Sequence, residues 1–123
     1  MKVLYVDDEP FIREVAAMAL ELDPDFEVRT VESGVAALAM LETSDWQPEV
    51  ILLDVMMPEL DGPATLARLR QSERHATTPV IFMTAKAQAR DHEPLAALDV
   101  RGIITKPFEP TAVAGEVRRL LGR

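Results

Sequence analysis

The chain contains no cysteine, so disulfide bonds, thiolate metal sites and cysteine nucleophiles are excluded. It has no apolar run approaching the roughly 18 residues needed to span a membrane, and the run after Met1 and Lys2 is too short for a signal peptide. Basic residues are few, with 13 Lys and Arg against 21 Asp and Glu, so the formal net charge is -8. This balance argues against direct binding of nucleic acid or an anionic membrane. We expect a cytoplasmic protein, because a chain without cysteine is compatible with a reducing compartment.

The composition is that of an ordinary globular domain. Of the 123 residues, 48% are hydrophobic and 28% are charged. This length is enough for one domain with a sizeable core and too short for two. The sequence contains no repeat, linker or low-complexity tract, so we expect residues 1–123 to form a single domain.

Short apolar runs alternate with helical patterns along the chain. We interpret the runs as buried strands of a parallel sheet, at about residues 2–6, 26–31, 50–53, 80–83 and 103–105. Helical spacing follows each run, at about residues 10–22 and 33–42 and from residues 63, 94 and 109. Pro94 cannot donate the hydrogen bond of a helix interior, so we place it in a first turn, which leaves residues 86–92 as an extended loop.

Five alternating strand and helix units predict an α/β fold with helices on both faces of a parallel sheet. Right-handed crossovers leave few topologies. Among these, the flavodoxin-like (βα)5 three-layer sandwich with strand order 2-1-3-4-5 brings Asp7 and Asp8 next to Asp54. That pairing selects the order, which the apolar pattern alone does not determine.

Side chains that carry chemistry follow four of the predicted strands. Asp7 and Asp8 come after the first, Asp54 after the third, Thr84 after the fourth and Lys106 after the fifth. The carboxyl ends of parallel strands lie along one edge, so we expect these groups to meet. Three close carboxylates repel one another unless a cation joins them. Oxygen ligands without His or Cys predict Mg²⁺, with Mn²⁺ or Ca²⁺ as competitors.

These groups are the parts needed for phosphoryl transfer to a carboxylate. Asp54 is the predicted nucleophile because it ends the central and most apolar strand, and the other two aspartates are metal-side acids. Lys106 supplies a second positive charge and Thr84 a hydroxyl donor. Ala85 has almost no side chain, so an anion can approach the backbone there.

Four motifs resemble those of the receiver domain of two-component response regulators. They are Val6-Asp7-Asp8-Glu9, the stretch from Leu53 to Gly62, Met83-Thr84-Ala85 and Thr105-Lys106-Pro107-Phe108. Each motif alone is weak, but four in order across the whole chain form a specific signal. The resemblance implies a phosphorylation-dependent switch whose Asp54 accepts a phosphoryl group from a sensor histidine kinase or a histidine phosphotransferase. It also implies that the protein is not an enzyme beyond catalysing its own phosphorylation and dephosphorylation.

The resemblance further implies a set of ligands for Mg²⁺. Asp8, Asp54 and the backbone carbonyl of Met56 would hold the ion, and Asp7 would act nearby through water or as a further ligand. Met1 and the chain length favour a stand-alone regulator, and the alternative is a receiver excised from a longer protein whose output partner the motifs do not name.

A switching mechanism is implied in the same way. Lys106 would bridge the acids and then the phosphoryl group, Thr84 would swing toward a phosphoryl oxygen, and the Lys106–Pro107 bond would be cis. Receivers usually carry Tyr or Phe three residues before the lysine, but Ile103 stands there and has no ring to swing. We therefore expect phosphorylation to act on the segment 85–93, and on the partner surface that it forms with the last strand and the helices beside it.

Other polar groups have structural interpretations. Asp61-Gly62 is interpreted as a turn before a helix, Trp46 as a packing residue, Lys86 as pointing outward, and His75 and His92 as solvated.

Three alternative functions stay open. A flavodoxin should carry Ser, Thr and Gly after its first strand, where this chain has acids. An aspartate-nucleophile hydrolase would show a D-x-D pattern there, whereas these aspartates are adjacent. A binding module with vestigial phosphorylation would fail to bind Mg²⁺.

Overall fold

The computed structural model of the protein describes residues 1–85 and 89–123. Within them, five parallel strands form one sheet in the order β2-β1-β3-β4-β5. The strands are β1 (Lys2–Val6), β2 (Glu27–Val31), β3 (Val50–Asp54), β4 (Val80–Thr84) and β5 (Gly102–Thr105). The helices are α1 (Pro10–Leu20), α2 (Gly34–Thr43), α3 (Gly62–Arg70), α4 (Ala89–Ala96) and α5 (Val113–Leu121), with a short 3₁₀ helix at Glu73–His75.

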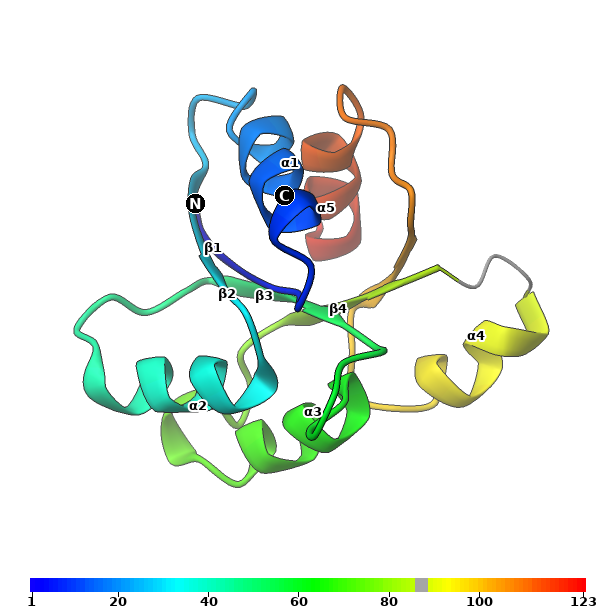
Figure 1. Ribbon diagram of the computed structural model, residues 1–123. Coiled ribbons are helices and arrows are strands. Elements are labelled where there is room, and N and C mark those ends of the chain that lie inside the picture. Colours follow the sequence, from blue (N-terminus) through cyan, green and yellow to red (C-terminus); the bar gives the residue numbers. More distant parts are fainter. Residues whose placement is uncertain (86–88) are drawn as a thin grey trace.

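Helices cover both faces of the sheet. Helices α1 and α5 lie on one face, and α2, α3 and α4 lie on the other (Figure 1). Alternate residues of β1 divide between the two cores, with Val3 and Tyr5 facing α1 and α5, and Leu4 and Val6 facing the other side. The predicted fold class and strand order are confirmed.

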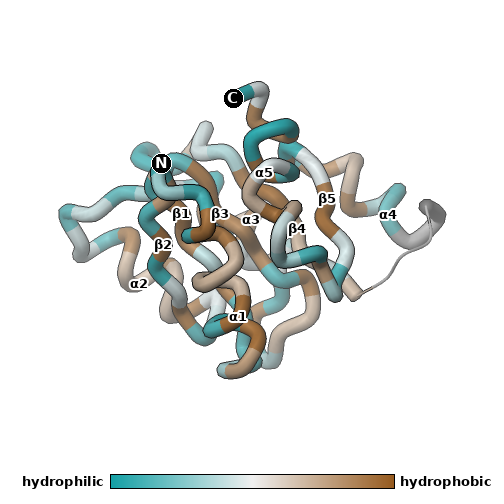
Figure 2. Tube along the Cα trace, turned by 90° about the horizontal axis from the view of Figure 1, so that it is seen from above, coloured by the Kyte–Doolittle hydropathy of each residue, from teal (hydrophilic) through white to brown (hydrophobic). Residues whose placement is uncertain are grey.

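The two central strands are buried along their whole length. Every residue of β3 and of β4 is buried, and Figure 2 shows hydrophobic residues gathered along the central strands. Burial on both faces requires apolar side chains at successive positions, so these strands appear in the sequence as continuous runs. In the part of the chain that the structure describes, each helix is too short or too polar to cross a bilayer.

The prediction for the segment before Pro94 was wrong where the structure describes it. Helix α4 begins at Ala89, and Pro94 lies inside it and not in its first turn. The proline removes one backbone hydrogen bond, but the helix ends two residues later and Leu95 is buried against the core. The interpretation of Lys86 falls outside the described residues, as does part of the expected switching segment.

The last helix also begins later than predicted. We expected it to open at Glu109, whereas α5 starts at Val113. The carbonyl of Glu109 accepts hydrogen bonds from the N–H groups of Ala112 and Val113, both at 3.0 Å. The intervening residues therefore form a turn that leads into the helix.

Two apolar residues within the helical patterns at residues 10–22 and 33–42 are exposed. Helix α1 ends at Leu20, so Leu22 lies beyond it and is 65% exposed. Val35 is 52% exposed because α2 turns Ala37 and Leu41 toward the core instead. Helical spacing thus indicates an apolar stripe without determining which residues at its edges are buried.

His75 is buried and not solvated as predicted. Only 3% of it is exposed, and its Nδ1 lies 2.9 Å from the Thr78 hydroxyl oxygen. Arg70 holds this turn by donating to the carbonyls of His75 and Thr78 at 2.8 and 2.7 Å. Burial lowers the pKa of His75, and the nearby Arg74 and Arg70 lower it further.

We expect His75 to make folding stability fall on acidification. The unfolded chain binds the proton more readily than the folded one, because the pKa of His75 is lowered below 6.5 in the fold. The free energy of unfolding therefore decreases as pH falls through the window below 6.5. Urea unfolding of wild type and His75→Gln, at about pH 7.5 and about pH 5.5, measures this component. An equal loss of stability in the variant would contradict the prediction, and His92→Gln is the matched control.

Candidate functional site

The carboxyl ends of the strands bring the predicted site residues to one edge of the sheet. Val6 pairs with Leu53 in neighbouring strands, so Asp7 and Asp54 both follow at the same level. The chain then leaves β1 toward α1 and β3 toward α3, which lie on opposite faces of the sheet (Figure 1). The predicted convergence therefore depends on the pairing of two strands that are distant in sequence.

Three carboxylates form an acidic cluster at this edge. Asp7, Asp8 and Asp54 each place one oxygen so that the three atoms lie within 4.8 Å of one another. Asp7 is fully buried and Asp54 is 4% exposed, while Asp8 is the most exposed of the three. Such a set of close, acceptor-only oxygens without His or Cys fits a hard divalent cation such as Mg²⁺.

The ammonium of Lys106 lies between two of these acids. Its Nζ is 3.1 Å from Asp7 Oδ2 and 3.1 Å from Asp54 Oδ1, and its side chain is 14% exposed. Burial alone would lower the pKa of Lys106, but hydrogen bonds to Asp54 and Asp7 outweigh it and raise that pKa above its usual value. Lys106 is therefore a fixed positive charge beside both carboxylates.

The backbone around Lys106 is also anchored. Its N–H donates to the carbonyl of Thr84 at 2.7 Å, and this bond joins the ends of β4 and β5. The Lys106–Pro107 peptide bond is cis, which is the isomer that the resemblance implied.

The surroundings of the Asp54 carboxyl disfavour its ionised form. Burial raises its pKa, as do the charges of Asp7 and Asp8, whereas the hydrogen bond from Lys106 lowers it. The balance leaves the pKa of Asp54 at about 6. The ionised carboxylate is thus short of positive charge, and a cation bound by the cluster would supply it.

Two residues that contact the cluster were missed in the sequence. The Tyr5 hydroxyl donates to Asp7 Oδ2 at 3.1 Å, and Arg13 Nη1 donates to the Asp7 carbonyl at 2.8 Å. Burial, followed by the charge of Asp7, raises the pKa of Tyr5, so its hydroxyl stays protonated as a donor. The sequence does show Tyr5, an aromatic residue with a hydroxyl group, two positions before Asp7, and residues at this spacing share one face of a strand.

The remaining predicted site residues lie around this edge. Thr84 ends β4 and is 1% exposed, and Ala85 follows it at the surface. Met56 lies two residues after Asp54 and is 69% exposed, and its backbone carbonyl stays a predicted ligand. Ile103 lies in β5, partly buried against the core beneath α4.

The loop after Asp54 is held by a close backbone approach. Gly62 donates its N–H to the Val55 carbonyl at 2.9 Å, and a Cβ on Gly62 would lie 2.7 Å from the Asp54 carbonyl oxygen. The Asp61 side chain caps α3 by accepting from the Ala64 N–H at 2.8 Å. This arrangement agrees with the structural interpretation of Asp61-Gly62.

Comparison with known families and sequences gives a consistent result. The family model described as the response regulator receiver domain matches residues 3–118. Response regulator Rre1 of Synechocystis sp. is 33% identical over 123 residues, which is 100% of this chain and 52% of that protein. Transcriptional regulatory protein CseB of Streptomyces coelicolor is 34% identical over 121 residues, which is 98% of this chain and 49% of that protein. The chain spans about half the length of these curated relatives.

Solved structures match over nearly the full length of both chains. The chemotaxis response regulator CheY4 of Vibrio cholerae has a TM-score of 0.85 at 29% identity, covering 97% of each chain. The receiver domain of the Francisella response regulator 1452 has a TM-score of 0.84 at 29% identity, covering 99% of this chain and 97% of that one.

Proposed function

The chain belongs to the response regulator receiver domain family, and on that basis we propose that it is a switch that accepts a phosphoryl group on Asp54. The observation that carries the proposal is the position of the Lys106 ammonium, 3.1 Å from Asp54 Oδ1, beside a cluster of three carboxylates. A carboxylate nucleophile with fixed positive charge nearby is suited to phosphoryl transfer.

Hydrogen bonding favours Asp54 over Asp7 as the nucleophile. Both carboxylate oxygens of Asp7 accept hydrogen bonds, Oδ2 from Tyr5 and Lys106 and Oδ1 from the Glu9 N–H. Asp7 is also fully buried. Burial and the charges of Asp7 and Asp8 raise the pKa of Asp54 in spite of the hydrogen bond from Lys106, so a cation bound nearby would favour its ionised form.

In the proposed reaction, an Asp54 carboxylate oxygen attacks the phosphorus of a phosphohistidine or a small acyl phosphate. The bond from phosphorus to the leaving group breaks, and Lys106 stabilises the negative charge on the transferring oxygens. The donor protein would be a sensor histidine kinase or a histidine phosphotransferase.

Mg²⁺ is the proposed cofactor, and Mn²⁺ or Ca²⁺ could substitute for it. Asp8, Asp54 and the backbone carbonyl of Met56 would hold the ion, with Asp7 nearby as a further acid. When bound, Mg²⁺ would neutralise the carboxylates and the phosphoryl oxygens. The close set of oxygen donors supports this assignment.

The proposed output is a change in the partner surface formed by the β4–α4 connection with α4, β5 and α5. Thr84, the last buried residue of β4, and Ala85, which follows it at the surface, would respond to the phosphoryl group. Ile103 stands where receivers usually carry an aromatic ring, and it lines an open surface hollow of about 310 Å³ together with Phe108 and the first turn of α5. Since isoleucine has no ring to swing, the proposed transmission rests on the loop after Thr84.

The chain is proposed to act on a protein and not directly on nucleic acid. A relative named as the DNA-binding dual master transcriptional regulator RpaA is matched over 49% of its length. The net charge of -8 opposes contact between this chain and phosphates of a nucleic acid.

Metal dependence tests the proposed function directly. We expect wild-type protein incubated with acetyl phosphate and Mg²⁺ to gain one phosphate per chain, and we expect a metal chelator to prevent this. Intact-protein mass spectrometry measures the uptake, and lability to hydroxylamine identifies an acyl phosphate. Uptake that needs no divalent cation would contradict the proposal, and repeated turnover of a generic phosphate ester would favour a hydrolase.

A further inference from the structure

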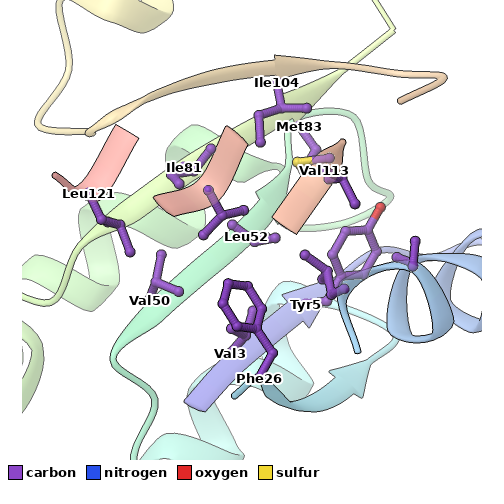
Figure 3. Packing of buried hydrophobic residues seen from close by; sticks show 14 residues of the cluster. Val3, Tyr5, Phe26, Val50, Leu52, Ile81, Met83, Ile104, Val113 and Leu121 are labelled. Atoms are coloured by element: carbon purple, nitrogen blue, oxygen red, sulfur yellow. The ribbon is translucent and has the colours of Figure 1, made fainter. Parts of the chain in front are cut away.

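The only tyrosine of the chain lies inside the core directly behind the acidic cluster. Tyr5 is fully buried in β1 among the aliphatic residues that pack under α1 and α5. Figure 3 shows its ring within this group, with the hydroxyl oxygen pointing away from Val3 and Phe26. Phenylalanine would fill the same space without a polar atom, so core packing does not require the hydroxyl.

The hydroxyl belongs to a chain of hydrogen bonds that reaches Asp54. Tyr5 donates to Asp7 Oδ2 at 3.1 Å, and the same oxygen accepts from Lys106 Nζ at 3.1 Å. Lys106 Nζ also lies 3.1 Å from Asp54 Oδ1. The Glu9 N–H holds the other oxygen of Asp7 at 3.0 Å. The Asp7 carboxylate is thus held by donors at both oxygens, and it presents one oxygen to the lysine.

We propose that Tyr5 is a positioning residue whose hydroxyl fixes the Asp7 carboxylate and, through it, the Lys106 ammonium beside Asp54. The proposal rests on the proposed function of Asp54 as the phosphoryl acceptor. A lysine side chain is long and flexible, so its ammonium keeps one position only where its acceptors are themselves fixed. The Tyr5 hydroxyl donates to Asp7, so it would act on Asp54 through Asp7 and Lys106.

Tyr5→Phe tests the proposal by removing only the hydroxyl. We expect the maximal rate of phosphorylation by acetyl phosphate to fall about tenfold, since one hydrogen bond to a charged group is lost in a buried site. The acetyl phosphate concentration at half-maximal rate should stay unchanged, because the hydroxyl does not contact the donor.

A spectroscopic measurement on the lysine separates positioning from general loosening. The chain has three lysines, Lys2, Lys86 and Lys106, so protein labelled with ¹⁵N-lysine has few side-chain ammonium signals to assign. In the absence of any phosphoryl donor, we expect Tyr5→Phe to speed hydrogen exchange of the Lys106 ammonium about threefold, because its acceptor is less firmly held.

Val3→Ala is the matched control, because Val3 is fully buried two residues earlier on the same face of β1. It should lower the melting temperature and leave exchange at Lys106 unchanged. The proposal would be overturned if the Lys106 ammonium exchanged equally fast in Tyr5→Phe and in wild type. It would also be overturned if Val3→Ala raised that exchange rate as much as Tyr5→Phe does. Either outcome can occur while the wild-type protein still takes up phosphate. If the wild-type protein took up no phosphate, the proposed function itself would be overturned.

Discussion

Asp54→Asn is expected to abolish phosphate uptake from acetyl phosphate in the presence of Mg²⁺. Asparagine preserves the shape of the side chain, but its amide is not a nucleophile for phosphorus, so the rate should fall by at least about a thousandfold. Intact-protein mass spectrometry over time measures the loss. No other carboxylate of the cluster should replace Asp54, because both oxygens of Asp7 already accept hydrogen bonds and Asp8 is the most exposed acid.

The loss should not arise from unfolding. The pKa of Asp54 is raised from 3.8 to about 6, so the ionised carboxylate destabilises the folded state at neutral pH. Removing that charge should stabilise the metal-free protein by about 3 kcal/mol. Asp61→Asn is the matched control, because it changes a nearby carboxylate to an amide that still caps α3. Equal phosphate uptake by Asp54→Asn and wild type would show that another residue is the acceptor.

Lys106→Met is expected to destabilise the metal-free protein by about 3 kcal/mol, because it leaves buried carboxylates without their cation. The ammonium is hydrogen-bonded to both Asp7 and Asp54, and these two acids are almost completely buried. Divalent metal should recover part of the loss, since it supplies positive charge to the same carboxylates. Urea unfolding of the variant and wild type, each with chelator and with Mg²⁺, measures the difference.

The surface lysine Lys2 supplies the control for this experiment. Lys2→Met removes a positive charge at the exposed start of β1, so its effect should stay within about 0.5 kcal/mol and be independent of Mg²⁺. If Lys106→Met were as stable as wild type in the presence of chelator, the lysine would not be compensating the buried acids. Its proposed role in holding charge beside Asp54 would then fail.

Family membership and the acidic cluster together argue against the alternative functions considered from the sequence. A flavodoxin needs a phosphate-binding loop after its first strand, whereas this strand is followed by Asp7 and Asp8. These acids contribute to a cluster that repels a free phosphate and attracts a cation. The hydrolase and the vestigial module differ from a receiver in turnover and in metal binding, which the experiments above measure.

Local sequence determined the strands and the positions of the motif residues. Strands buried on both faces need apolar side chains in succession, so β3 and β4 were recognisable without any knowledge of their neighbours. The acids and the lysine follow such runs directly. Because all strands of a parallel sheet end at one edge, this pattern placed Asp7, Asp54 and Lys106 along that edge, and the pairing of β1 with β3 then brings the two acids together.

Tertiary structure decided which atoms touch and which polar groups are buried. The Tyr5 hydroxyl donates to Asp7 Oδ2 from only two positions away in the sequence. Lys106 donates to the same oxygen, but it lies 99 positions from Asp7. His75 is buried in the turn after α3, where Arg70 donates to the carbonyls of His75 and Thr78. Such contacts depend on packing between distant segments, and the pattern of apolar residues along a chain does not encode them.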